Sequence, residues 1–410
     1  MFIRSRPSEP AQAEPMHILL LPSWYPETPD STDGIFFREQ AHALARAGLR
    51  VGVAAPLFRS PRRWREIFAG RYGTRVFSDG LIPTYTAHNS YLCPPLPHFD
   101  RERWLAAGMR LFARYLAEQG RPDILHAHAV NHGGILAQRI AAKHGIPYVI
   151  TEHSSTYARG LIRRWQRPAM RAAVQGAAAR LAVSPAFCRL LESEYPGLGW
   201  QYLPNILGRA FAENIPPPER PSENAANDAF TFCAVARLDR NKGFDTLLAA
   251  FALAMRQQPA LRLEIGGGGT ELAKLRRLTA SLGIAQAVTF HGVLDNAAVL
   301  ALMRRSDAFV LASRSETFGV VFIEALSQGL PVAATRCGGP EGIVNESNGL
   351  LVPPDNPAAL ADALLQLHAN RRRYNAAALR ADCLAQYGEA AVTGRLKNIY
   401  RAVLQNAKAV

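Results

Sequence analysis

Short apolar runs alternate with longer amphipathic stretches along most of this chain. Four runs in the first half have the length of buried strands: 17–21, 50–54, 123–128 and 147–150. Two stretches with helical periodicity, 36–47 and 135–144, each end at a glycine that can close a helix. Such alternation predicts a parallel sheet that is covered by helices on both faces.

The same pattern restarts after a polar connector. Between Asn205 and Asp228 the chain carries four prolines and several asparagines without any periodicity. Beyond it, four further apolar runs predict strands: 230–235, 261–265, 287–290 and 308–311. The fold class is therefore α/β, with two doubly wound domains that face each other across a cleft. Ligands are expected at the carboxyl ends of the strands.

The composition shifts divide the chain into five segments. The first fifteen residues lack an apolar core, so they are not a secretory signal and are expected to be a disordered tail, with Met16 as an alternative start. The predicted boundaries are 1–15 for the tail, 16–206 for the N-terminal Rossmann-like domain, 207–228 for the linker, 229–388 for the second Rossmann-like domain and 389–410 for a C-terminal helix.

Two carboxylates eight residues apart, Glu316 and Glu324, form the most informative motif. They flank Gly319, where a buried strand at 308–311 gives way to a helix at 320–327. The backbone amides of Phe318, Gly319 and Val320 would lie at the positive end of that helix and could hold a diphosphate. Eight helical residues rise about 12 Å, more than a glycosidase pair needs, so we assign separate hydroxyl-binding roles on a sugar and a ribose. Alternatively, Glu316 caps the helix and Glu324 is a solvated charge.

Arg237 and Lys242 are five residues apart in a loop that leaves a predicted strand. Both cations can converge on one diphosphate leaving group, Arg237 as a fork and Lys242 as a point charge. A surface loop with unrelated basic residues is the alternative. Three glycines complete the predicted donor side: Gly34, Gly267 and Gly292. For the glycine run at 266–269, which contains Gly267, a simple turn is an equally consistent alternative.

Histidines and a carboxylate end two strands of the first domain. His126 and His128 lie on one face of their strand, and Glu152 and His153 end the next one. We predict that one of His126 and His128 touches the sugar or the acceptor hydroxyl, and that Glu152 and His153 line the acceptor side. Core positions with satisfied hydrogen bonds are the alternative. No third and fourth ligand accompany the histidines, so no metal site is expected.

The positive charge of the chain predicts a surface that could bind an anionic membrane. The chain has 410 residues, 48% of them hydrophobic and 20% charged, with a net charge of +14. Arginines surround large apolar residues at 59–75 and 159–171, a pattern that suits an anionic membrane surface, although solvated faces are equally consistent with it. No nucleic-acid motif accompanies the charge. Five scattered cysteines indicate a reduced, cytoplasmic protein, peripheral on the inner membrane if the arginines bind lipid.

In combination, these motifs resemble the retaining nucleotide-sugar glycosyltransferases of family four. The resemblance rests on Arg237 with Lys242–Gly243, the pair Glu316 and Glu324, the Gly338–Glu341 turn and the 348–352 segment, and it runs from about residue 16 to 405. The 22–26 segment, Pro-Ser-Trp-Tyr-Pro, is similar to the branch that builds bacterial surface polysaccharides.

The resemblance implies the GT-B fold, which has two Rossmann-like domains with the donor on the second, and a helix near 390–404 that crosses back to the first. It implies that Glu316 contacts the donor sugar, Glu324 the ribose, and His128 the sugar or acceptor. It also implies a UDP- or GDP-linked donor, no cofactor and no metal. By the same resemblance, 16–206 is expected to bind the acceptor and 229–388 the nucleotide sugar. Three features depart from the family pattern: only Gly34 remains of the glycine-rich turn in the first loop, Glu341 lies one place early, and Pro204–Asn205 is followed by isoleucine instead of glycine.

The predicted function is therefore a retaining hexosyltransferase that moves a sugar to a glycan or a lipid-linked acceptor in cell-surface polysaccharide synthesis. Without an obvious nucleophile, the departing phosphate itself is expected to take the acceptor proton on the same face. A nucleotide-sugar epimerase, a phosphorylase and a non-catalytic nucleotide-sugar-binding protein remain alternatives.

Overall fold

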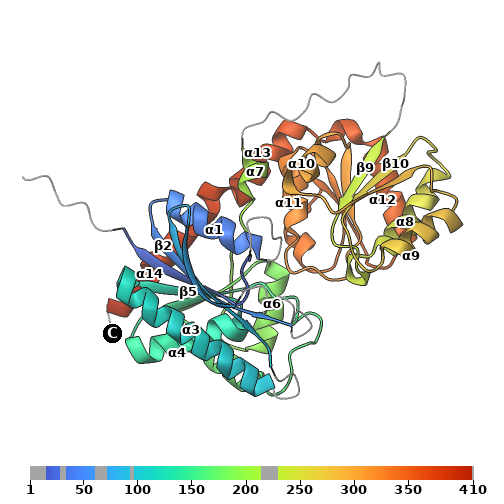
Figure 1. Ribbon diagram of the computed structural model, residues 1–410. Helices are drawn as coiled ribbons and strands as arrows, with labels where there is room; N and C mark the ends of the chain where they lie inside the picture. Colours follow the sequence, from blue (N-terminus) through green and yellow to red (C-terminus); the bar gives the residue numbers. More distant parts are fainter. Residues whose placement is uncertain (1–14, 28–33, 61–71, 93–96, 214–229, 409–410) are drawn as a thin grey trace, which may run out of the picture.

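The computed structural model describes residues 15–27, 34–60, 72–92, 97–213 and 230–408. Figure 1 shows two α/β domains side by side, each built on one sheet. The predicted α/β class and the two doubly wound domains of a GT-B fold are confirmed. Most of the tail predicted at 1–15 and of the linker predicted at 207–228 lies outside the described residues.

The N-terminal sheet has the strand order β3-β4-β2-β1-β5-β6-β7-β8. Its strands are β1 (His17–Pro22), β2 (Arg50–Arg59), β3 (Gly73–Asp79), β4 (Ile82–Ser90), β5 (Ile124–His128), β6 (Tyr148–Glu152), β7 (Ala179–Ala182) and β8 (Gln201–Tyr202). All pairings are parallel except β3 with β4. Its helices are α1 (Ile35–Arg46), α3 (Pro97–Gln119), the π-helical turn η2 (Val130–Gly134), α4 (Ile135–His144), α5 (Arg167–Gly176) and α6 (Pro185–Glu194).

The C-terminal sheet is parallel throughout, in the order β11-β10-β9-β12-β13-β14. Its strands are β9 (Thr231–Val235), β10 (Arg262–Gly266), β11 (Val288–Gly292), β12 (Ala308–Leu311), β13 (Val332–Thr335) and β14 (Gly349–Val352). Its helices are η3 (Arg240–Lys242), α8 (Phe244–Met255), α9 (Leu272–Ser281), α10 (Asn296–Arg304), α11 (Val320–Ser327), η4 (Gly339–Gly342), α12 (Pro357–Ala369), η5 (Arg371–Arg373) and α13 (Ala376–Tyr387).

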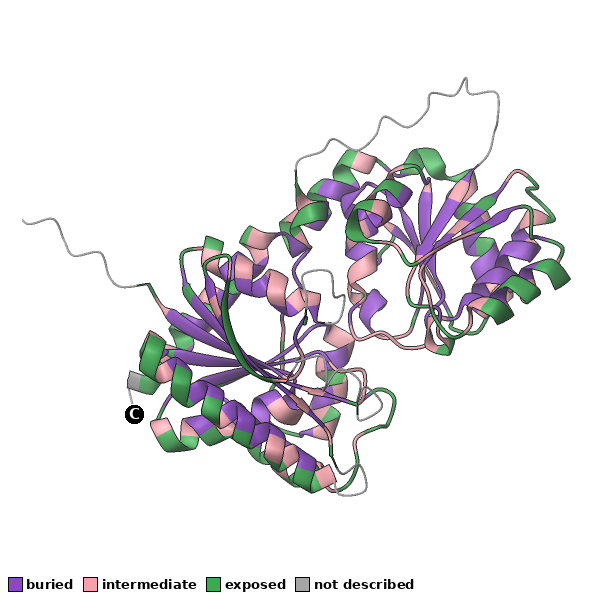
Figure 2. Cartoon of the chain, viewed as in Figure 1, coloured by how far each residue is buried: buried purple, intermediate pink, exposed green. Residues whose placement is uncertain are grey.

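Burial explains why the strands are so clear in the sequence. Figure 2 shows both sheets buried at the centre of their domains, with exposed residues on the outer faces of the helices. The strands β1, β12 and β13 have no exposed residue, which is the signature of a sheet covered on both faces. The edge strand β3 is almost wholly exposed, so it gives no apolar signal and the sequence pattern does not predict it.

Helix α14 (Glu389–Lys408) returns from the second domain and lies along the first (Figure 1). It buries one face, Val392, Leu396, Tyr400 and Val403, in a core cluster that also holds residues of β1 and α1. These positions are three or four residues apart, as one helical face requires. Within that contact, the Tyr400 hydroxyl lies 2.6 Å from His126 Nδ1.

The connector enters the second domain earlier than predicted. Residues Arg209–Ala212 form a short helix, α7, inside the segment assigned to the linker. The guanidinium of Arg380, buried on α13, donates to the carbonyls of Phe211, Ala212 and Glu213 at 2.8–3.2 Å. These bonds fix residues 211–213 to helix α13, so this part of the predicted linker packs on the C-terminal domain.

We expect Tyr400→Phe to loosen the docking of α14. The change leaves one ring nitrogen of the fully buried His126 without its partner, which costs about 1–3 kcal/mol of unfolding free energy. Urea unfolding followed by circular dichroism measures the loss. Arg401→Ala on the same helix, where the side chain bonds only to Asn398 among the described contacts, should stay within about 0.5 kcal/mol. Equal stability of both variants would contradict the role of this bond.

Candidate active site

Three loops of the C-terminal domain meet where β9, β12 and β13 end. Their backbones touch directly: a Cβ on Gly243 would overlap the carbonyl oxygen of Ala312, and one on Gly339 would overlap the backbone of Phe318. Gly243 also has a left-handed φ of 64°. Glycine is therefore required at both contacts, because a side chain would push the loops apart.

Lys242 and Glu316 form an ion pair at this meeting point. Their side chains are 22% and 12% exposed, so the pair is shielded but reachable. The hydroxyl of the buried Ser313 donates to Glu316 Oε1 at 2.9 Å. The structure thus places together two residues that lie 74 positions apart and were predicted separately as leaving-group and sugar contacts.

Helix α11 begins a few residues after Glu316 in the chain. Gly319 caps it with φ 97° and no side-chain hydrogen bond. Within the described part of the chain, the amides of Phe318, Gly319 and Val320 have no recorded hydrogen-bond acceptor. Free amides at a helix N-terminus attract an anion. The ring of Phe318 is buried against Tyr387, so this residue offers its backbone and not its side chain.

Glu324 lies on α11, one turn below its start, and is half-buried. Its carboxylate makes no recorded hydrogen bond to the described residues, and burial raises its pKa to about 7. An unpaired, poorly solvated carboxylate is costly unless a ligand donates to it. Its placement suits the ribose contact that was predicted for it.

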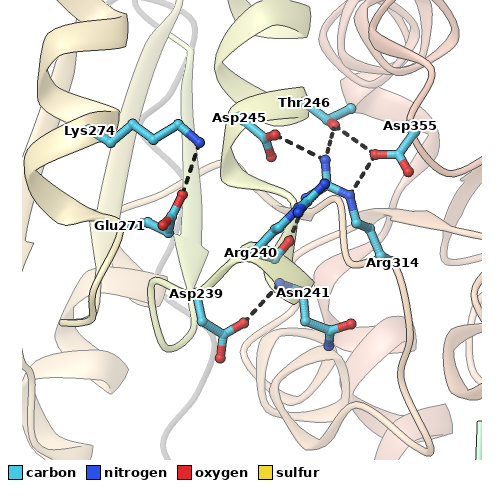
Figure 3. A network of polar contacts seen from close by, with 9 residues as sticks. All are labelled: Asp239, Arg240, Asn241, Asp245, Thr246, Glu271, Lys274, Arg314 and Asp355. Atoms are coloured by element: carbon cyan, nitrogen blue, oxygen red, sulfur yellow. Dashed lines mark hydrogen bonds and ion pairs between the residues drawn. The ribbon is translucent and has the colours of Figure 1, made fainter. Parts of the chain in front are cut away.

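Arg314 organises the loops around this pair, although no sequence motif singles it out. Figure 3 shows its guanidinium between Asp245, Thr246, Asp355 and the carbonyl of Arg240. The distances to Asp245 Oδ2 and Asp355 Oδ1 are 3.0 and 2.8 Å. It therefore connects the loop after β9, the loop after β12 and the segment after β14.

Asn241 completes the same framework. Its Nδ2 donates to the Ser315 carbonyl at 2.9 Å, and its own carbonyl accepts from the Arg314 amide at 2.7 Å. Nothing in the local sequence marks Ser313, Asn241 or Arg314 as functional, because their partners lie in distant loops.

The remaining predicted donor residues fall at different places. Arg237 is 74% exposed and contacts Asp239 at 2.8 Å, so it lies on the surface of the same loop as Lys242. At Gly267 a Cβ would overlap the carbonyl of Ala236, so this glycine lets two loops touch, and its donor contact stays a prediction. Gly292 has φ 73° with open space around its Cβ position, and its carbonyl accepts from Gly267 at 2.7 Å. Gly34 caps α1 in the other domain, with φ 77°.

His128 and His153 form a buried pair at the carboxyl ends of β5 and β6. His128 Nδ1 lies 3.1 Å from His153 Nε2, and the His128 ring packs 4.6 Å from that of Phe37. Burial lowers the pKa of His153 to about 3 and holds the pKa of His128 well below its ordinary value, with the neighbouring histidines adding to the shift, so both are neutral. Nε2 of His128 is buried with no partner among the described residues.

Two acceptor-side predictions are wrong. His126 is fully buried, and both of its ring nitrogens are hydrogen-bonded within the protein. One bonds to the Tyr400 hydroxyl and the other to the Thr151 hydroxyl at 2.7 Å. Glu152 is also fully buried and accepts the amides of Val130, His153 and Ser154 at 2.7–2.8 Å. Burial raises the pKa of Glu152 to about 6, while those amides oppose the rise. Both side chains stabilise the carboxyl ends of β5 and β6 through hydrogen bonds within the protein and do not face a ligand.

The arginine clusters differ from each other. Arg59 is buried and pairs with Glu27 at 2.5 Å, so it is no membrane-facing charge, and residues 61–71 of that cluster lie outside the described ranges. The five arginines of the 159–171 cluster are exposed, beside the 45% exposed Leu161. Among the described helices, none combines the length and apolarity of a bilayer span.

Known proteins resemble both halves of the chain. The sequence model described as Glycosyltransferase Family 4 matches residues 34–198, and that described as Glycosyl transferases group 1 matches residues 217–382. The D-inositol 3-phosphate glycosyltransferase of Arthrobacter sp. (strain FB24) is 28% identical over 374 residues, which cover 83% of this chain and 84% of the relative.

The glycogen synthase of Mycobacterium tuberculosis (strain ATCC 25618 / H37Rv) is 30% identical over 360 residues, 84% of either chain. Among solved structures, Anabaena Alr3699/HepE in complex with UDP superposes with a TM-score of 0.70 at 18% identity, covering 94% of this chain and 100% of that one. Two family models that together span both domains, and a relative at this identity over most of the chain, identify the protein as a member of the group 1 and family 4 glycosyltransferases.

Proposed function

We propose that this glycosyltransferase takes a sugar from a UDP- or GDP-linked donor, keeps the anomeric configuration and needs no metal ion. The observation that carries the proposal is the Lys242–Glu316 pair beside the free amides at the start of α11. A cation and a helix N-terminus suit a diphosphate, and a carboxylate suits sugar hydroxyls. The UDP complex of the structurally similar HepE supports a nucleotide donor at this fold.

The proposed reaction breaks the bond between the anomeric carbon and the diphosphate. Negative charge grows on the leaving oxygen, where Lys242, Arg237 and the α11 amides would stabilise it. The same oxygen then takes the proton of the acceptor hydroxyl, and that hydroxyl bonds to the anomeric carbon on the face that the phosphate leaves. The unpaired Nε2 of His128 is our candidate for a sugar hydroxyl contact, since a buried polar atom without a partner needs one.

The acceptor and the location of the protein are proposed from its relatives and from an exposed arginine cluster. The relatives named above are an inositol phosphate glycosyltransferase and a glycogen synthase, so membership of the family leaves the acceptor open. The exposed arginines at 159–171 beside Leu161 support a peripheral site on an anionic membrane, which suits the synthesis of surface polysaccharides on lipid-linked acceptors.

A panel of nucleotide sugars in EDTA tests the proposal through release of nucleoside diphosphate and transfer to membrane extract. We expect Lys242→Ala to lower turnover by about 10²–10³, because it removes a cation from the leaving group. Arg240→Ala, a neighbour in the same loop, should stay close to the wild type. Activity that requires Mn²⁺, or unchanged turnover in Lys242→Ala, would refute the assignment, and an inverted product in an anomeric NMR assay would refute retention.

Donor binding should depend on pH through Glu324. Its pKa of about 7 means that the carboxylate is mostly protonated at pH 6 and mostly ionised at pH 8. Ribose hydroxyls donate to the ionised form, so affinity for UDP-glucose should rise about tenfold between these pH values. Calorimetric titration of UDP-glucose is the measurement, since its diphosphate carries no titrating group in this range.

Glu324→Gln should bind more weakly and lose that pH dependence, while Glu341→Gln at the exposed turn should keep it. The same carboxyl also affects folding. Its folded pKa lies above the unfolded value of 4.5, so the folded state holds the proton more tightly and loses stability as pH rises from about 4.5 to about 7. A flat pH profile in the wild type would contradict the ribose assignment.

A further inference from the structure

A cavity of about 360 Å³ lies in the N-terminal domain, apart from the donor loops. It opens where β2, β4 and β5 end, next to the place where the strand order reverses between β1 and β5. Ligands of open α/β sheets bind at such reversals. Its polar and aromatic walls come from Tyr91, Asp100, Arg101, Asn131, His132 and Trp165.

The wall formed by β5 and η2 is held in a strained conformation. Ala129 and His132 have φ values of 66° and 67°, which are rare for residues with a side chain. The Glu152 carboxylate fixes the Val130 amide, and Ser23 Oγ accepts the Gly133 amide at 2.9 Å. Such backbone strain persists where surrounding contacts impose it, and it concentrates at ligand sites.

Arg101 supplies the cavity's cation. Its side chain is 13% exposed and lies over the Trp165 ring, with Cζ 5.3 Å from the ring centre. Its one ion pair among the described contacts is a long one, 3.4 Å to Glu102. Nε and Nη1 are buried and have no acceptor in the described part of the chain. A buried guanidinium with unused donors is costly unless an oxyanion completes it.

The other charges leave this cation dominant. Asp100 accepts from Arg103 Nη1 at 3.0 Å, so its charge is paired. His132 is neutral, since burial and then Arg101 lower its pKa to about 4. The side-chain oxygen of Asn131 is buried without a partner among the described residues and could accept a hydrogen bond from a hydroxyl group. The site thus combines one cation, one hydroxyl acceptor and an aromatic face.

We propose that this cavity binds the acceptor of the transfer reaction and that the acceptor carries an oxyanion, a carboxylate or a phosphate, next to a sugar ring whose hydroxyl reaches Asn131. The proposal rests on the glycosyltransferase function proposed above and adds the chemical class of its acceptor. Arg101 pairs with the oxyanion, Asn131 accepts a ring hydroxyl, and the acceptor lies in the domain opposite the donor loops.

Binding tests the proposal without relying on turnover. With the donor site filled by UDP, we would titrate glucose 6-phosphate and galacturonate, and glucose and galactose as their neutral counterparts, by calorimetry. At least one acid should bind about tenfold tighter than its neutral counterpart, and Arg101→Gln should abolish that difference. Arg101→Lys, which keeps the charge, should retain part of it and shows that loss in Arg101→Gln is not misfolding.

Arg110→Gln on the exposed face of the same helix is the matched control and should leave the difference intact. Tighter binding of the phosphate indicates a phosphorylated acceptor, and tighter binding of the uronate an acidic sugar. Equal binding of acids and neutral sugars, or wild-type binding of acids by Arg101→Gln, overturns the proposal. Donor hydrolysis without acceptor should survive in Arg110→Gln, whereas its absence in the wild type would count against the proposed function instead.

Discussion

Direct backbone contact between the loops that leave β9, β12 and β13 is the constraint on which the donor site depends. Gly243 against Ala312 and Gly339 against Phe318 allow these loops to approach without intervening side chains. Because parallel strands end at the same edge, residues from three distant segments converge there. Lys242 can then reach Glu316, and Arg314 can bond across the same junction. A bulkier residue at either glycine would separate the partners before any chemistry was affected.

Burial acts on two carboxylates of this protein with different results. Glu152 is fully enclosed but accepts three backbone amides, so its charge is balanced from within and it shapes the loop after β5. Glu324 has no such donors among the described residues, and burial raises its pKa to about 7. The difference in hydrogen bonding therefore distinguishes the structural carboxylate from the one that a ligand could reach.

The described residues hold the two domains together at three points. Helix α14 packs its apolar face on the first sheet, and Arg380 holds the connector on the second domain through backbone carbonyls. Between them, Pro185 at the start of α6 meets Gly342 at the end of η4. The donor loops and the cavity that holds Arg101 thus belong to separate domains whose spacing is set by α14, the connector and this contact.

The sequence by itself determined the architecture and the donor motifs. Strands buried on both faces are continuous apolar runs, so the positions of β1, β5 and β12 follow from the order of residues alone. The Glu316 to Glu324 motif could be recognised because its members lie on one strand-loop-helix unit. Only the tertiary structure decided which polar groups were already satisfied: His126 and Glu152 have hydrogen-bond partners in other elements, whereas Arg101 Nε and Nη1, Asn131 Oδ1 and the Glu324 carboxylate have no hydrogen-bond partner among the described residues. Periodicity reports burial, but hydrogen-bond partners are set by contacts between residues far apart in the chain, and no local pattern encodes those.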